Sequence, residues 1–112
     1  MEAQIKALAD PQRRRILELV ADRELRAGEI ADHFDVTRPA ISQHLTVLKQ
    51  AGLLDERRDG TRRLYRAQPG GLLGLKQFVD RMWAVGLAQL KAEAEAEAEA
   101  EAENANRTGR TH

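Results

Sequence analysis

The sequence predicts a mainly α-helical domain with one small β-hairpin, built from five helices with the hairpin before the last one. Three observations support this fold class. Apolar side chains recur every three or four residues through most of residues 2–90, as in amphipathic helices. Aromatic residues make up 4% of the chain although 42% is hydrophobic, so small and aliphatic residues must build the core. Residues 53–67 break the helical pattern around an Asp-Gly pair, as a hairpin does.

The first three predicted helices are short. Residues 2–9 form the first, and Asp10-Pro11 begins the second, because Asp is a good N-cap and Pro fits the first helical position. The second helix runs to about Asp22, and the third spans about residues 27–34. The first helix carries Ile5, Leu8 and Ala9 on one side. The side chains that we expect the second and third helices to bury are Ile16, Leu17, Leu19 and Val20, then Ile30, Ala31 and Phe34.

The fourth helix follows the short polar connection 35–37. Thr37 is a good N-cap, and Pro39 is tolerated in a first turn, where backbone amides lack helical acceptors. The helix continues to about Gln50, and Gly52 stops it. Its inward face is formed by Ile41, Leu45 and Leu48, at the spacing of one helix side.

A β-hairpin is predicted around Asp59-Gly60, which favours a two-residue type I′ turn. In that register Leu54 lies opposite Tyr65, and Arg57 lies opposite Arg62. Like charges that close repel one another, so we expect an anion to relieve the cluster at the hairpin tip. The cluster consists of Arg57, Arg58, Arg62 and Arg63.

The last helix begins near Leu72 and extends at least to Leu90, about 28 Å at ~1.5 Å per residue. It carries more apolar surface than so small a domain can cover, and a second copy of the chain is the expected cover. Residues 92–103 alternate Ala and Glu and predict a fraying helical extension, and residues 104–112 a disordered end. The expected division is therefore a domain of residues 1–91 followed by a tail of residues 92–112. The apolar surface of the last helix, described above, is formed by Leu72, Leu75, Phe78, Val79, Met82, Trp83, Gly86 and Leu87.

Composition excludes several classes of protein. The chain has no Cys, which rules out disulfides and thiolate metal sites, and no apolar run approaches the length of a membrane span. Polar and acidic residues stand near the start where a signal peptide needs an apolar block, so we expect a cytoplasmic protein.

The formal net charge of zero hides a segregation of charge. Residues 92–112 contain six Glu and two Arg, whereas residues 37–66 contain seven basic and three acidic residues. A local basic stretch of this kind is typical of a protein that binds a polyanion, although a solvated charged face has the same composition.

Helix, short turn, helix and then a basic hairpin is the order of a winged helix-turn-helix. The second helix of such a motif fits the major groove of double-stranded DNA, where every base pair presents a different edge. The exposed face of the fourth helix carries side chains that can bind bases or phosphates, and the hairpin arginines would lie over the backbone or enter the minor groove. An ordinary solvated amphipathic helix is the alternative, but it does not explain the Arg-rich hairpin. The residues of the exposed face are Arg38, Ser42, Gln43, Thr46 and Lys49.

Three segments resemble the ArsR-type (arsenic-repressor-like) winged-helix repressors: ALADPQRRRILELV, GEIADHFDVTRPAISQHLTVLKQAGLL and RRDGTRRLYR. The resemblance covers about residues 3–90. It implies a recognition helix at 38–50, repression by occupying an operator, and a homodimer formed by the first and last helices. The dimer residues would be Ile5, Leu8, Leu72, Leu75, Phe78, Val79, Met82 and Trp83. The implied DNA contacts are Thr37, Arg38, Pro39, Ser42, Gln43 and His44, with the hairpin contributing residues 57–63.

The sequence departs from this family at its metal sites. The segment that carries arsenite-binding cysteines in some members corresponds to ELRAGEI here, with Arg26 and Gly28 at the thiol positions. The last helix offers Asp80 but no His, and the three histidines, His33, His44 and His112, stand in separate elements. We therefore expect no metal and no cofactor, and His44 is more typical of a helix-packing or phosphate-facing residue than of a metal ligand.

The leading hypothesis is a homodimeric repressor that binds a palindromic operator in double-stranded DNA. One alternative is a winged-helix module that binds proteins and has lost DNA binding. Another is a repressor that senses a ligand not identifiable from the sequence. An enzyme is not expected, because no nucleophile stands with a base and no phosphate loop is present.

Overall fold

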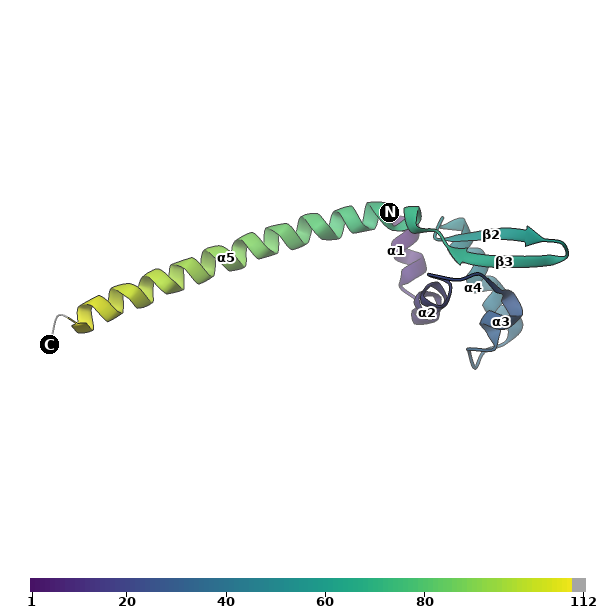
Figure 1. Cartoon of the computed structure of the whole chain (residues 1–112), viewed down its shortest axis with the longest axis horizontal. Coiled ribbons are helices and arrows are strands. Elements are labelled where there is room, and N and C mark those ends of the chain that lie inside the picture. Colours follow the sequence, from purple (N-terminus) through teal and green to yellow (C-terminus); the bar gives the residue numbers. More distant parts are fainter. Residues whose placement is uncertain (110–112) are drawn as a thin grey trace. The chain divides into compact units, whose positions relative to one another are not determined.

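The computed structural model describes residues 1–109 and contains the five predicted α-helices, a short 3-10 helix and three strands (Figure 1). In chain order the elements are α1 (Glu2–Leu8), α2 (Pro11–Leu19), β1 (Leu25–Arg26), α3 (Ala27–Ala31), α4 (Arg38–Gln50), β2 (Leu54–Asp59), β3 (Arg62–Ala67), the 3-10 helix η1 (Pro69–Leu72) and α5 (Leu73–Gly109). The chain divides into two compact units, Met1–Lys76 and the remainder of α5 from Gln77. The mainly helical fold class and the hairpin before the last helix are confirmed.

The N-terminal unit has one apolar core. Its fully buried side chains come from four helices and the sheet, and the partly buried Leu8, Leu19, Leu25 and Phe34 pack around them. The predicted inward face of α4 is confirmed, since Ile41, Leu45 and Leu48 are all buried. The core residues are Ala7, Ile16, Leu17, Val20, Ile30, Ile41, Leu45, Leu48, Ala51, Leu53, Leu54 and Tyr65.

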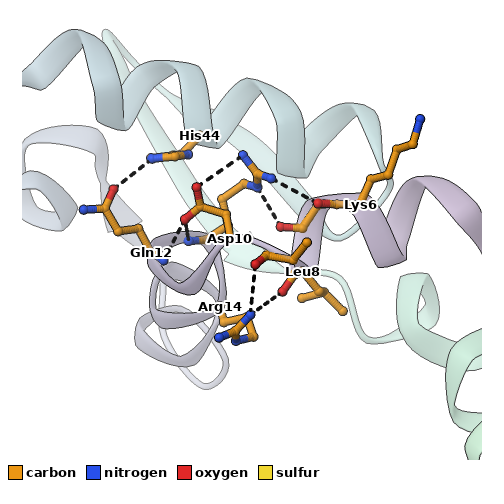
Figure 2. A network of polar contacts seen from close by, with 9 residues as sticks. Lys6, Leu8, Asp10, Gln12, Arg14 and His44 are labelled. Atoms are coloured by element: carbon orange, nitrogen blue, oxygen red, sulfur yellow. Dashed lines mark hydrogen bonds and ion pairs between the residues drawn. The ribbon is translucent and has the colours of Figure 1, made fainter.

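The corner between α1 and α2 is held by side chains that satisfy helix ends (Figure 2). Asp10 accepts hydrogen bonds from the backbone amides of Gln12 and Arg13, which confirms it as the N-cap of α2. Arg13 Nε donates to the carbonyl of Ala7, at 2.6 Å, and Arg14 Nη1 donates to that of Leu8, at 2.7 Å. These carbonyls end α1 and have no helical donor of their own, so the two arginines cap α1 while Asp10 caps α2.

Helices α2 and α3 end earlier than the sequence predicted. The carbonyl of Val20 accepts a hydrogen bond from the amide of Ala67 in β3, at 2.9 Å, and α2 ends at Leu19 instead of Asp22. After Ala31 the amides of His33 and Phe34 bond three residues back, to Ile30 and Ala31, so the last turn tightens and α3 does not reach Phe34 as a regular helix.

The sheet has three antiparallel strands in the order β1-β3-β2. The sequence predicted only the hairpin of β2 and β3, which reaches away from the helices of this unit and is called the wing below (Figure 1). Strand β1 pairs Leu25 with Tyr65 and Arg26 with Leu64. A strand of two residues has no sequence pattern of its own and forms only because the fold brings it beside β3.

The register of the wing differs from the prediction. Leu54 pairs with Ala67 instead of Tyr65, and Asp59 pairs with Arg62, so the loop consists of Gly60 and Thr61. Gly60 has φ +64° and no other wing residue has a positive φ. A type I′ turn needs positive φ at both central positions, whereas type II′ needs it only at the first. The predicted I′ turn at Asp59-Gly60 is therefore wrong, and the loop begins one residue later.

Helix α5 begins at Leu73, close to the predicted start, and continues through Gly109. Residues 104–109 are thus helical where the sequence predicted a disordered end, and residues 110–112 lie outside the described part. The Ala/Glu segment 92–103 is helical as expected. Helix α5 has no break at residue 91. The division into a domain of residues 1–91 and a tail of residues 92–112 therefore remains a prediction. None of the helices within residues 1–109 is long and apolar enough to cross a membrane.

Candidate nucleic-acid interface

Helix α4 presents the predicted polar face to solvent. The Thr37 side chain accepts a hydrogen bond from the amide of Ala40 at 3.3 Å, which confirms it as the N-cap, and Pro39 stands in the first turn. One side of α4 is apolar and buried, and the polar residues between the buried positions lie on the side that faces solvent. The exposed residues are Thr37, Arg38, Pro39, Ser42, Gln43, Thr46, Lys49 and Gln50, and all but Gln50 were predicted to contact DNA.

The side chains on this face differ in whether contacts within the chain hold them in place. Thr46 Oγ1 donates to the carbonyl of Ser42 at 3.0 Å, so this hydroxyl is oriented by its own helix. The Arg38 guanidinium lies against Gly28 of α3, where an added Cβ would be 3.4 Å from Nη1. No hydrogen bond or ion pair within residues 1–109 holds the Gln43 side chain, which therefore has its amide available for a base edge.

His44 does not belong to this face. Its side chain is half-buried between α4 and α2, and Nε2 lies 3.0 Å from Oε1 of Gln12 (Figure 2). The structure thus places His44 apart from the other predicted contact residues, in a packing position.

The four arginines predicted at the hairpin tip do not form one cluster. Residues paired directly across two antiparallel strands lie on the same face, and successive pairs alternate between faces. Arg58 pairs with Arg63 on one face, while Arg57 pairs with Leu64 and Arg62 pairs with Asp59 on the other. Arg57 and Arg62 are thus diagonal neighbours instead of the predicted direct pair, and the direct pair of like charges is Arg58 with Arg63.

Two carboxylates of the chain neutralise part of the wing. Glu24 accepts from Arg57 through both oxygens, at 2.6 Å from Nη2 and 3.2 Å from Nε. Glu56 pairs with Arg63 Nε at 3.3 Å and with Lys49 of α4. The pKa of Glu24 is lowered chiefly by its hydrogen bond from Arg57, and that of Glu56 by its hydrogen bond from Lys49.

Two arginines close to the wing loop have no ion pair within residues 1–109. Within residues 1–109 no carboxylate lies within ion-pair distance of Arg58 or Arg62, and both side chains are exposed. These cations flank the loop of Gly60 and Thr61. Glu24 and Glu56 therefore supply part of the negative charge that the sequence predicted at the wing, and Arg58 and Arg62 keep their charge unpaired near its tip.

Sequence reasoning missed Glu24 and Glu56. A signal for Glu56 was present, because the two-residue period of β2 puts it on the same face as buried Leu54. A carboxylate on an inward face needs a cation, which Lys49 supplies. Glu24 lies in the turn before β1, and nothing in the sequence connects that turn to the wing.

The residues predicted to form a dimer interface are largely exposed. In the N-terminal unit Ile5 is 41% and Leu72 37% exposed, whereas Leu8 and Leu75 are half-buried. In the second unit Val79, Met82 and Trp83 are 51%, 55% and 68% exposed. An apolar groove of about 290 Å³ runs along this part of α5. Its lining consists of Phe78, Val79, Met82, Trp83, Gly86, Leu87 and Leu90.

The described residues contain no group of three His, Cys, Asp or Glu side chains that could hold a metal ion. Arg26, at a position where the resemblance implies a thiol in arsenite-binding members, pairs through Nε with Glu29 at 3.0 Å. The absence of a metal site stays a prediction of the sequence.

The chain is similar to known bacterial regulators. Residues 10–56 match the bacterial regulatory protein arsR family. The HTH-type transcriptional regulator Rv2034 of Mycobacterium tuberculosis is 49% identical over 88 residues, which cover 76% of this chain and 82% of that protein. The transcriptional repressor SdpR of Bacillus subtilis is 47% identical over 55 residues, which cover 49% of this chain and 61% of that protein.

Among solved structures, one similar fold is the solution structure of the homodimeric winged helix-turn-helix DNA-binding domain of Mb0332 from Mycobacterium bovis, a possible ArsR-family transcriptional regulator. It matches with a TM-score of 0.60 at 32% identity, over 74% of this chain and 77% of that one.

Proposed function

Because the chain belongs to the arsR family of bacterial regulatory proteins, we propose that it is a transcriptional repressor that binds double-stranded DNA through α4 and the wing. The observation that carries this proposal is the exposed polar face of α4 beside a wing whose tip bears two unpaired arginines. A helix of this size fits the major groove, and cations at the wing tip attract phosphates.

The residues on α4 have distinct roles in this proposal. Gln43 can form two hydrogen bonds with an adenine and Arg38 two with a guanine, which gives sequence specificity. Thr37, Ser42, Thr46 and Lys49 are suited to phosphates or base edges, and Pro39 packs against the backbone. His44 positions α4 through its contact with Gln12 and is not a direct contact in this proposal.

The repressor acts as a homodimer on a palindromic operator. Two copies joined through α1 and α5 would present two α4 helices to successive major grooves, about 34 Å apart on one face of the duplex. The homodimeric Mb0332 domain and the uncovered apolar face of α5 both support this assembly. A protein that acts on bacterial chromosomal DNA works in the cytoplasm, and it needs neither a catalytic centre nor a cofactor to block transcription.

Gln43→Ala tests the base-reading role. Wild-type protein is first used to select duplexes from a randomised library, and affinities for a selected and a scrambled duplex are then measured by fluorescence anisotropy across a salt series. We expect wild-type affinity to fall steeply with salt, with a slope set by ~6–10 phosphate contacts. Gln43→Ala should lose about 1–3 kcal/mol on the selected duplex and little on the scrambled one.

Gln77→Ala is the matched control, because it removes the same side chain from an exposed position of α5 and should leave both affinities unchanged. Equal losses on both duplexes with Gln43→Ala would contradict the base-reading role. A wild-type protein that binds no duplex even at low salt would favour the protein-binding module instead.

A further inference from the structure

Glu56 links the recognition helix to the wing. Its side chain is only 13% exposed and pairs with Lys49 of α4 and with Arg63 Nε of β3, at 3.3 Å from the latter. These residues line a groove of about 380 Å³ between α4 and the wing. The remaining lining residues are Leu45, Thr46, Gln50 and Tyr65.

The position of this groove determines which part of a bound DNA duplex would lie in it. If α4 occupies a major groove and the wing tip reaches the adjacent minor groove, one phosphate strand separates the two. That strand must pass between α4 and the wing. Lys49 and Arg63 stand on the two sides of this passage, and exposed Arg58 lies opposite Arg63 in the sheet.

A carboxylate in this place has two opposing effects. Its charge repels phosphate, which lowers the affinity for any DNA. However, Lys49, Arg63 and Arg58 repel one another without it, and flexible cationic side chains lose entropy when DNA must order them. A carboxylate that fixes two of these cations before DNA binds removes part of this entropy cost. The benefit is limited to DNA whose phosphates fit the fixed positions of the two cations.

We propose that Glu56 is a positioning residue for DNA recognition, which holds Lys49 and Arg63 at the spacing that fits the phosphate strand between the major and minor grooves. Glu56 thereby raises the preference for the operator over other DNA. This inference rests on the proposed function, since it concerns the same DNA-binding surface.

Two substitutions separate positioning from charge. Glu56→Gln removes the charge at nearly constant size, and Glu56→Asp keeps the charge but shortens the side chain by one methylene. Affinities are measured for the duplex selected by the wild-type protein and for its scrambled form. We expect both substitutions to reduce the ratio of the two affinities about tenfold, equivalent to about 1.4 kcal/mol. On the scrambled duplex Glu56→Gln should bind more tightly than wild type.

Glu18→Gln is the control, because Glu18 is an exposed carboxylate on α2, outside this surface, and its loss should leave the ratio unchanged. A double-mutant cycle adds a readout that a purely structural role would not alter. Lys49→Ala should lower operator affinity less in the Glu56→Gln background than in the wild type, because Lys49 is then no longer held in place. Thermal unfolding of each variant checks that the fold is retained.

The outcomes distinguish this inference from the proposed function. If Glu56→Gln raises both affinities by one factor while Glu56→Asp matches the wild type, Glu56 acts only by repulsion and the inference is wrong. Additive effects in the cycle also contradict it. If the wild-type protein itself selects no duplex, the proposed function fails before Glu56 is tested.

Discussion

At the scale of single residues, ion pairs within the chain decide which cations are available to a ligand. Arg57 and Arg62 look equivalent in the sequence, yet Arg57 is held by both oxygens of Glu24 while Arg62 has no ion pair within residues 1–109. Because Nε and Nη2 of Arg57 both donate to Glu24, this guanidinium has fewer donors left for a phosphate than that of Arg62. The two arginines should therefore contribute unequally to DNA binding.

Arg62→Ala should weaken binding to every duplex by a similar factor and lower the salt slope by about 1, because one phosphate contact is lost. Arg57→Ala should have a smaller effect on both quantities. Affinities for selected and scrambled duplexes across a salt series measure this difference. Equal losses from the two substitutions would show that the bond between Arg57 and Glu24 does not survive in solution or opens on DNA.

At the scale of elements, the C-terminal end of α4 sets where its exposed polar face stops and the wing begins. Ala51 is the C-cap, and Gly52 follows with φ +74°. The amide of Leu53 donates to the carbonyl of Leu48 and that of Gly52 to the carbonyl of Lys49, both at 3.0 Å, which is the Schellman arrangement. Gly52 thus turns the chain from α4 into β2.

Gly52→Ala should lower the free energy of unfolding by about 1 kcal/mol, because a residue with a Cβ is strained at this φ. Gly74→Ala is the matched control: its backbone is helical, and a Cβ there would meet nothing within 4 Å. That substitution should leave stability unchanged or raise it slightly. Urea unfolding followed by circular dichroism measures both. Equal destabilisation by the two substitutions would contradict the role of Gly52.

At the scale of the whole molecule, the apolar side of α5 is the feature that one copy of the chain leaves uncovered. Val79, Met82, Trp83, Gly86 and Leu90 recur on one side of the helix and line a common groove. Exposed apolar patches of this kind mark association surfaces. A symmetric dimer would bury the groove and bring together two DNA-binding surfaces, which a palindromic operator requires.

Trp83→Glu should dissociate the dimer, because it places a charge in the middle of this groove. Ala88→Glu adds the same charge on the opposite side of α5 and should leave the dimer intact. Sedimentation velocity over a concentration series distinguishes monomer from dimer. Operator affinity should fall with Trp83→Glu alone, since a monomer binds only one half-site. A Trp83→Glu protein that still sediments as a dimer would contradict the predicted interface.

Much of the fold follows from local rules. The N-caps at Asp10 and Thr37, the helix stop at Gly52 and the buried side of α4 depend on neighbours within one or two turns, so the residues alone determine them. The exposed polar face of α4 follows in turn, because its polar residues stand at helical spacing between the apolar ones. The family resemblance, carried by contiguous segments, was likewise readable from the chain.

Other features needed contacts between residues distant in sequence. The register of the wing depends on which loop position has a positive φ. In the structure this position is the first of the loop, and Gly60 occupies it. Strand β1 exists only beside β3. The bond of Glu24 to Arg57 spans 33 residues, and that of Gln12 to His44 spans 32. The sequence alone thus determined which elements form and where polar side chains gather. Only the tertiary structure decided which of those charges are paired, because pairing depends on side chains that meet after the elements pack.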